Sequence, residues 1–149
     1  MERESYPIHP SENTRMGVEQ DRYDRMDEMD EMEDINAYIK ANIEYDSLVE
    51  AYPFERREIE ELVNLMVDVI VSKKPYIRIN GCDMPYQVVR STFEKQNYTT
   101  IEYILVSMRQ NTTKVRNIRS YMLTALYNAP LTCNNYYKTE VNHDLHGID

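Results

Sequence analysis

The segment 55–72 constrains the fold of this chain more than any other, because its apolar residues recur at helical spacing along its whole length. They form one broad stripe: Ile59, Leu62, Val63, Met66, Val67 and Ile70. Residues three and four apart lie on one face of an α-helix, and an apolar face has to be buried against other elements. Acidic residues crowd the first turns, and Lys73 and Lys74 follow the end, as the helix dipole favours. The segment therefore predicts an amphipathic helix from about Glu55 to Ser72.

The same periodicity predicts shorter helices on both sides of this one. We expect helices over residues 35–43, 47–52, 86–96, 99–108, 117–130 and 132–143. Polar residues able to cap a helix precede four of them: Asp46, Thr99 paired with Glu102, Asn117 and Thr132. Pro53 and Pro130 are expected to end two of them, since proline lacks the N–H that a helix interior needs. Inward-facing apolar residues are expected on two of the later helices: Val88, Val89, Phe93, Ile118, Tyr121, Met122, Ala125 and Leu126.

A short β-hairpin interrupts the helices after Pro75. Residues 76–80 alternate with β-branched side chains, Gly81 can turn the chain, and 84–86 can form the returning strand. The predicted fold class is therefore mainly α: a compact bundle of about six helices with one short β-hairpin, preceded by a disordered acidic tail. The connections are short, so neighbouring helices should pack against one another.

The acidic tail comprises residues 1–33, ahead of a helical domain over 34–149. Residues 1–34 hold twelve acidic and four basic residues, so they carry most of the chain's net charge of −9. With few branched apolar residues, such a segment buries too little surface to offset its ordering entropy, and we expect it to be disordered or a frayed helix. Met26, Met29 and Met32 lie at helical spacing and form a stripe that could dock on the body or join two copies.

The body is nearly neutral, but its charges are unevenly distributed. Residues 73–119 hold nine basic and three acidic residues, whereas 44–68 hold eight acidic and two basic residues. A chain of this kind can present a positive face to nucleic acid or to an acidic protein. The alternative is that the two stretches form solvated helix faces that complement each other.

No arrangement of residues predicts catalysis or a cofactor. The two cysteines, Cys82 and Cys133, are far apart, and neither has a neighbouring base. His143 and His146 could ligate a metal three residues apart, but the alternative is an ordinary helix end. With three glycines in the chain, there is no glycine-rich phosphate loop. We expect a non-enzymatic protein without metal or cofactor, and, for lack of an export signal or apolar span, a cytoplasmic one without membrane contact.

The polar loop between two predicted helices, 111–117, is the best candidate for a binding site. Its amides and hydroxyls, and the free N–H groups of the helix that follows, can bind a phosphate. The alternative is a polar turn that caps one helix and starts another. The candidate partner- or DNA-binding residues are those of the loop and the nearby bases: Arg109, Asn111, Thr113, Lys114, Arg116, Asn117, Arg119, Lys73, Lys74, Arg78 and Arg90. Tyrosines between them could stack on bases, although half-buried core tyrosines are the simpler interpretation.

Three stretches, 39–81, 88–130 and 134–147, resemble the C-terminal domain of replication initiator protein A of plasmids and integrative elements in Firmicutes. The most specific motifs are TTKVRNI…LYNAP and NYY…VNHD. The resemblance implies a helical domain similar to that of the DnaD-type primosome proteins, which contacts host replication proteins, including the primase. That family begins with an origin-binding winged-helix domain, and residues 1–34 resemble only its acidic linker. Origin recognition is therefore not expected of this chain.

Three functions follow as hypotheses. The first is an interaction module that recruits host replication proteins, such as primase or helicase-loading factors, to a plasmid or mobile-element origin. The second is direct, weakly sequence-dependent binding of single-stranded DNA, motivated by the basic stretch. The third is homo-oligomerisation through the methionine stripe.

Overall fold

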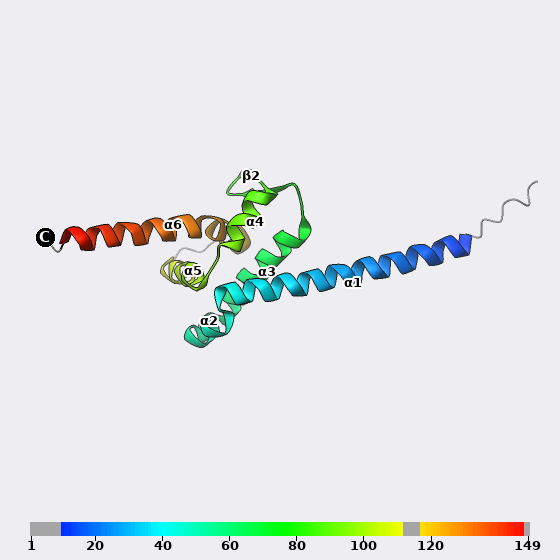
Figure 1. The fold of residues 1–149 in the computed structure, drawn as a ribbon, viewed down its shortest axis with the longest axis horizontal. Coiled ribbons are helices and arrows are strands. Elements are labelled where there is room, and N and C mark those ends of the chain that lie inside the picture. The colour runs from blue at the N-terminus through cyan, green and yellow to red at the C-terminus, as the bar shows by residue number, and fades with distance from the viewer. Residues whose placement is uncertain (1–9, 112–116, 148–149) are drawn as a thin grey trace, which may run out of the picture. The chain divides into compact units, whose positions relative to one another are not determined.

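The computed structural model describes residues 10–111 and 117–147, with side chains described over 19–111 and 117–133. The chain divides into two units, residues 1–34 and 35–149. Its elements are, in order, α1 (Pro10–Ile43), α2 (Tyr45–Ala51), the 3₁₀ turn η2 (Pro53–Glu55), α3 (Arg56–Ser72), β1 (Tyr76–Ile79), β2 (Cys82–Pro85), α4 (Tyr86–Glu94), α5 (Tyr98–Gln110) and α6 (Ile118–Gly147) (Figure 1). The predicted class, mainly α with one short hairpin, is confirmed.

The helix α1 includes the described part of the acidic segment and the first predicted helix of the body. Of the two forms expected for the acidic segment, the structure describes the helical one from Pro10 onward. No proline or glycine lies between Glu19 and Ile43 to end the helix at Asp34. It ends at Ile43, and Glu44 follows with a left-handed φ of 55°. Docking of the methionine stripe stays a prediction.

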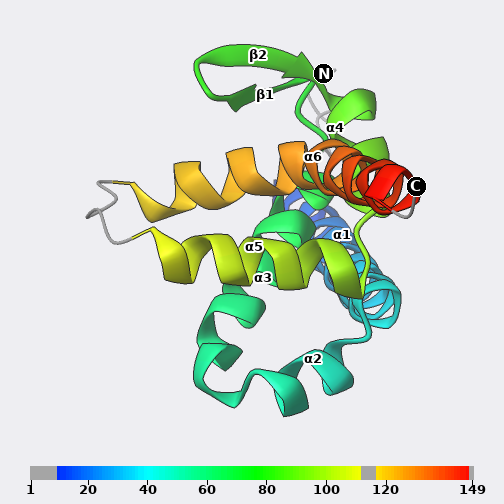
Figure 2. The same ribbon diagram turned by 90° about the vertical axis from the view of Figure 1, so that its left-hand side faces the viewer.

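The core is built around α3, as the apolar stripe of its sequence predicts. All six predicted stripe residues are buried, and Leu65 and Val69 are buried with them. Figure 2 shows α5 and α6 lying side by side across α3, and the three helices contact one another. Ile104 of α5 and Leu126 of α6 belong to the same buried cluster. Burial of such side chains contributes about 1.5–3 kcal/mol each, so α3 organises the fold.

The hairpin is confirmed, with small changes in its bounds. Its antiparallel register pairs Tyr76 with Pro85 and Ile79 with Cys82. The two residues of the turn, Asn80 and Gly81, have positive φ angles of 52° and 81°. Such a pair is typical of the tight turns whose twist matches the flanking strands.

Of the four predicted helix caps, Asn117 is right and three are wrong, including Thr132, which is discussed with Pro130 below. Asp46 lies within the first turn of α2, which begins after Glu44. The box on α5 is formed by Asn97 and Thr100, two residues before the predicted pair of Thr99 and Glu102. The prediction failed because several polar residues in succession can cap, and packing decides among them. Asn117 does cap α6, since its Oδ1 accepts a hydrogen bond from the N–H of Ser120 at 3.0 Å.

The inward-facing residues predicted for α4 and α6 are partly wrong. Val88 on α4 and Ile118 on α6 are exposed, whereas Val89, Phe93, Met122 and Leu126 are buried. Val88 lies next to the buried Val89, on the face of α4 that is turned to solvent, and Ile118 is the first residue of α6.

The predicted end of the helix at Pro130 is wrong, because α6 continues through this proline to Gly147. Thr132 therefore lies inside α6 and starts no helix. Proline has no N–H to donate to the carbonyl four residues earlier, which is that of Leu126. The side-chain Nε2 of Gln96 donates to this carbonyl instead, at 2.6 Å. Gln96 is only 2% exposed and lies between α4 and α5, so tertiary structure supplies the missing donor.

We expect Gln96→Leu to destabilise the protein by about 1–3 kcal/mol, because a buried carbonyl loses its partner. In a Pro130→Ala background the same substitution should cost less, since the alanine brings its own N–H. Urea unfolding of the four proteins in this double-mutant cycle measures the difference. Equal costs in the two backgrounds would show that Gln96 does not act through the proline.

Candidate functional site

The structure describes eight of the eleven predicted binding residues. Thr113, Lys114 and Arg116 lie outside the described residues. The others fall on two parts of the fold. Four flank the α5–α6 loop: Arg109, Asn111, Asn117 and Arg119. Four lie around the end of α3, the hairpin and α4: Lys73, Lys74, Arg78 and Arg90.

Both arginines near the hairpin pair with a carboxylate close by, Arg78 across the hairpin and Arg90 within α4. Arg78 Nη1 lies 3.2 Å from Asp83 Oδ1 across the hairpin. Arg90 Nε lies 3.1 Å from Glu94 Oε1, one turn further along α4, and this hydrogen bond raises the pKa of Arg90. These pairs reduce the local positive charge.

The two arginines beside the loop pair with carboxylates that are distant in sequence. Arg109 on α5 contacts Glu55 in η2, and Arg119 Nη1 lies 4.0 Å from Asp68 Oδ2 on α3. Both carboxylates belong to the acidic stretch 44–68. For these two arginines the structure therefore supports the alternative interpretation of the charge pattern, in which the basic and acidic stretches complement each other.

The two asparagines that flank the loop have structural roles. Asn117 caps α6, as described above. The N–H of Asn111 donates to the carbonyl of Ser107 at 3.1 Å and ends α5. For both residues the structure supports the simpler alternative, a polar turn that closes one helix and opens the next.

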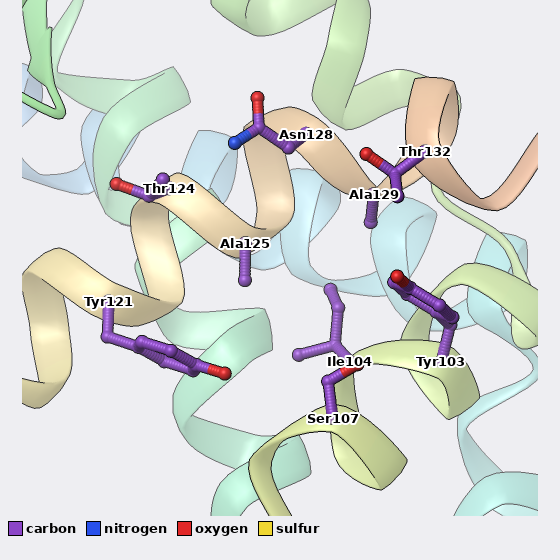
Figure 3. A pocket seen from close by; sticks show the side chains of 9 residues that line it. All are labelled: Tyr103, Ile104, Ser107, Tyr121, Thr124, Ala125, Asn128, Ala129 and Thr132. Atoms are coloured by element: carbon purple, nitrogen blue, oxygen red, sulfur yellow. The ribbon is translucent and has the colours of Figure 1, made fainter. Parts of the chain in front are cut away.

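A groove between α5 and α6 was not predicted from the sequence. Its volume is about 240 Å³, and the described residues that line it are all uncharged: Tyr103, Ile104 and Ser107 from α5, and Tyr121, Thr124, Ala125, Asn128, Ala129 and Thr132 from α6 (Figure 3). Most of the side chains that α6 contributes to the lining are small, and they leave a hollow beside α5. The sequence signal was the row of small polar residues four apart: Thr124, Asn128 and Thr132.

Two tyrosines border the groove. In Figure 3 the rings of Tyr103 and Tyr121 lie on either side, with Ala125 and Ala129 between them on α6. Both tyrosines are partly buried. Amphipathic rings beside an apolar hollow are common at sites that bind protein segments, because they add contact area at little entropic cost.

The turn η2 carries the most exposed large apolar side chain of the described residues. The Phe54 side chain is 95% exposed. The residue before it is Pro53, whose ring fixes its own backbone φ. The turn is held to α5 at both ends. The hydroxyl of Tyr52 donates to Glu102 Oε2 at 2.5 Å, and Glu55 pairs with Arg109. A rigid turn thus presents an aromatic ring to solvent, a feature that we did not predict from the sequence.

Comparison with known proteins gives a family but no function. Residues 4–147 match a family of proteins of unknown function (DUF6017). The chain belongs to this family. No curated protein and no solved structure matches it.

Among the described residues of this family member, no three or more potential metal-ligating side chains form a group, and the side chains of His143 and His146 lie outside the described residues. Cys82 is exposed on the hairpin, whereas burial raises the pKa of the Cys133 thiol. Within the described residues no helix is long and apolar enough to cross a membrane.

Several tyrosines of the domain serve as hydrogen-bond donors between elements. The hydroxyl of Tyr86 donates to the carbonyl of Ile70 at 2.6 Å, and that of Tyr45 donates to Glu60. The hydrogen bond to Glu102 raises the pKa of Tyr52 to about 12. For these tyrosines the structure supports the simpler interpretation, a partly buried ring with a satisfied hydroxyl.

The bond between Tyr52 and Glu102 predicts a pH dependence. Because folding raises the pKa of Tyr52 from 10.0 to about 12, its contribution to stability is complete below pH 10 and is lost as the pH rises toward 12. Tyr52→Phe lacks this contribution at every pH. The difference in urea midpoint between wild type and variant should be constant up to pH 10 and shrink above it. A difference that stays constant to pH 12 would contradict the prediction.

Proposed function

We propose that residues 35–149 form a non-enzymatic interaction module of a replication initiator, which recruits host replication proteins to the origin of a plasmid or mobile element. The partners that the sequence resemblance implies are primase or helicase-loading factors, and the compartment is the bacterial cytoplasm. The observation that carries the proposal is the uncharged, tyrosine-bordered groove between α5 and α6, whose described lining residues other than Thr132 lie within the stretch 88–130 that resembles the initiator family.

A groove of this kind suits a segment of a protein better than a nucleic acid. Its lining residues carry no charge that could hold a phosphate. An amphipathic helix that binds in a groove places apolar side chains at intervals of three and four residues. The small side chains of Ala125 and Ala129 leave room for such side chains. Tyr103 and Tyr121 would provide the large contact surfaces on which binding energy concentrates.

Direct DNA binding is the second candidate. Exposed ion pairs contribute only about 0–1 kcal/mol, so Arg78 and Arg90 could exchange their carboxylates for phosphates. Against it, every arginine described above has a carboxylate within 4.0 Å, and these carboxylates repel a phosphate backbone.

The groove should be required for binding to the host partner. We expect Thr124→Trp, which fills the groove, to weaken capture of purified host primase or helicase loader at least tenfold. Ser91→Trp places the same side chain on an exposed position of α4 and should bind as wild type does. Calorimetry with the full chain measures both. Equal affinities for the two variants would rule out the groove, and the absence of binding by wild type would rule out these partners.

The same assay separates the groove from the loop. Charge reversal of Lys114, Arg116 and Arg119 together should leave partner binding within about twofold of wild type if the groove is the site, because the described lining of the groove is uncharged. A large loss of affinity would show that the loop, and not the groove, is the binding site.

Binding of single-stranded DNA should be weak, and its salt dependence tests the second candidate. Phosphate contacts release counterions, so true binding falls steeply between 50 and 200 mM salt. We expect no binding to an oligonucleotide at about 150 mM salt, measured by fluorescence anisotropy. Binding that persists there and is lost in Arg78→Ala with Arg90→Ala would favour DNA over a protein partner.

A further inference from the structure

The methionine stripe is a row of exposed apolar side chains on α1. Met26, Met29 and Met32 are 55%, 60% and 39% exposed, and Tyr23, three residues before Met26, is 63% exposed. Residues three apart are neighbours on a helix surface, so these side chains adjoin one another. Single exposed apolar side chains are ordinary on a protein, whereas a continuous row of them is typical of a surface that contacts a partner.

The charges around this row are predominantly negative. Residues 19–34 hold nine acidic residues and two basic ones, and both basic residues precede Met26. Glu28 lies four residues before Met32, and Asp30 lies four residues after Met26, so carboxylates lie directly beside the methionines. A partner that matches this surface therefore combines an apolar face with positive charge at its edges.

The acidic residues also repel one another along the helix. Asp27 and Glu31 are four residues apart on one face of α1, and so are Asp30 and Asp34. Like charges at this spacing destabilise a helix. A cationic partner relieves this repulsion and stabilises α1, whereas an anionic partner adds to it.

The same charges decide between possible occupants of the stripe. Nucleic acids and anionic lipids are negatively charged, so this segment repels both. A second copy brings an identical acidic segment, so pairing of two stripes would place like charges side by side. A positively charged protein segment with an apolar face matches both the methionines and the carboxylates beside them.

We propose that α1 binds a basic amphipathic helix of another protein through the methionine stripe. The partner places apolar side chains on the stripe at intervals of three and four residues, and its lysine or arginine side chains face the carboxylates. Methionine suits such a surface, because its flexible, polarisable side chain adapts to partners of different shape. The stripe shares no residue with the α5–α6 groove, so the proposal does not rest on the function proposed above.

A synthetic peptide of leucine and lysine, with leucines at intervals of three and four residues, provides a defined probe. A scrambled peptide of the same composition keeps the charge but has no apolar face. We expect the full chain to bind the first peptide at least about tenfold more tightly, and this binding to weaken between about 50 and 300 mM salt, because salt screens the charges. Fluorescence anisotropy measures both. Equal affinities for the two peptides would overturn the proposal, since acidic residues alone would bind either one.

Substitution of the methionines tests the apolar part of the surface. Met26→Gln, Met29→Gln and Met32→Gln together keep the charge and the helix propensity of the segment, and they should weaken binding of the amphipathic peptide about tenfold. An unchanged affinity would contradict the proposal. Thr124→Trp, which fills the α5–α6 groove, should bind this peptide as wild type does. A loss of affinity in Thr124→Trp would place the peptide in the groove instead of on α1.

Two matched double variants test the carboxylates beside the stripe. Glu28→Gln with Asp30→Asn removes two charges next to methionines, whereas Glu31→Gln with Asp27→Asn removes two charges that lie neither three nor four residues from any of them. The net charge of the two proteins is the same. The first should lose about threefold more affinity for the amphipathic peptide than the second. Equal losses would show that only the total charge matters and would refute the assigned surface.

The methionine methyl groups report on what covers the stripe before any peptide is added. In NMR spectra of the free full chain, the three methyl resonances should lie where those of exposed methionines lie, and they should shift when the amphipathic peptide binds. Resonances typical of buried methionines in the free, dilute chain would show that the stripe docks on its own chain. Shifts that grow with protein concentration would show that a second copy occupies it. Either result would overturn the proposal.

Discussion

The hydrogen bond from Gln96 to the carbonyl of Leu126 is the contact on which the shape of α6 depends. Pro130 removes the N–H that this carbonyl would otherwise accept, and a buried carbonyl without a donor costs about 1–3 kcal/mol. With the amide of Gln96 in its place, the helix continues, and Asn128 and Thr132 on the two sides of the proline share one face. The groove between α5 and α6 exists because this face is unbroken.

Packing of the helices also brings the oppositely charged stretches of the domain together. The acidic stretch 44–68 and the basic stretch 73–119 meet through Arg109 with Glu55 and Arg119 with Asp68. These exposed pairs add little stability, but they leave less free positive charge than the sequence suggests. The uncharged surface of the domain includes the groove and the exposed ring of Phe54.

Much of the fold could be predicted because it follows from local patterns. The stripe on α3, the hairpin with its turn at Gly81 and the cap at Asn117 depend on residues that are close in sequence. The prediction at Pro130 failed because the deciding partner, Gln96, is distant in the sequence, whereas those at Asp46 and Thr99 failed because each helix begins at a neighbouring residue. The candidate site was predicted less well. A groove forms where two helices meet, and the carboxylates that pair with basic residues can be identified only in the folded structure.

The sequence alone determined the helical class, the buried face of α3 and the concentration of negative charge in residues 1–34, because periodicity and composition act within one segment. Tertiary structure decided that α6 passes through its proline, that the arginines beside the loop pair with distant carboxylates and that Phe54 faces water. The first two depend on contacts between residues far apart in the chain, such as Gln96 and Leu126, which are 30 residues apart. The third depends on the absence of such a contact among the described residues. Such contacts leave no periodic trace in the sequence.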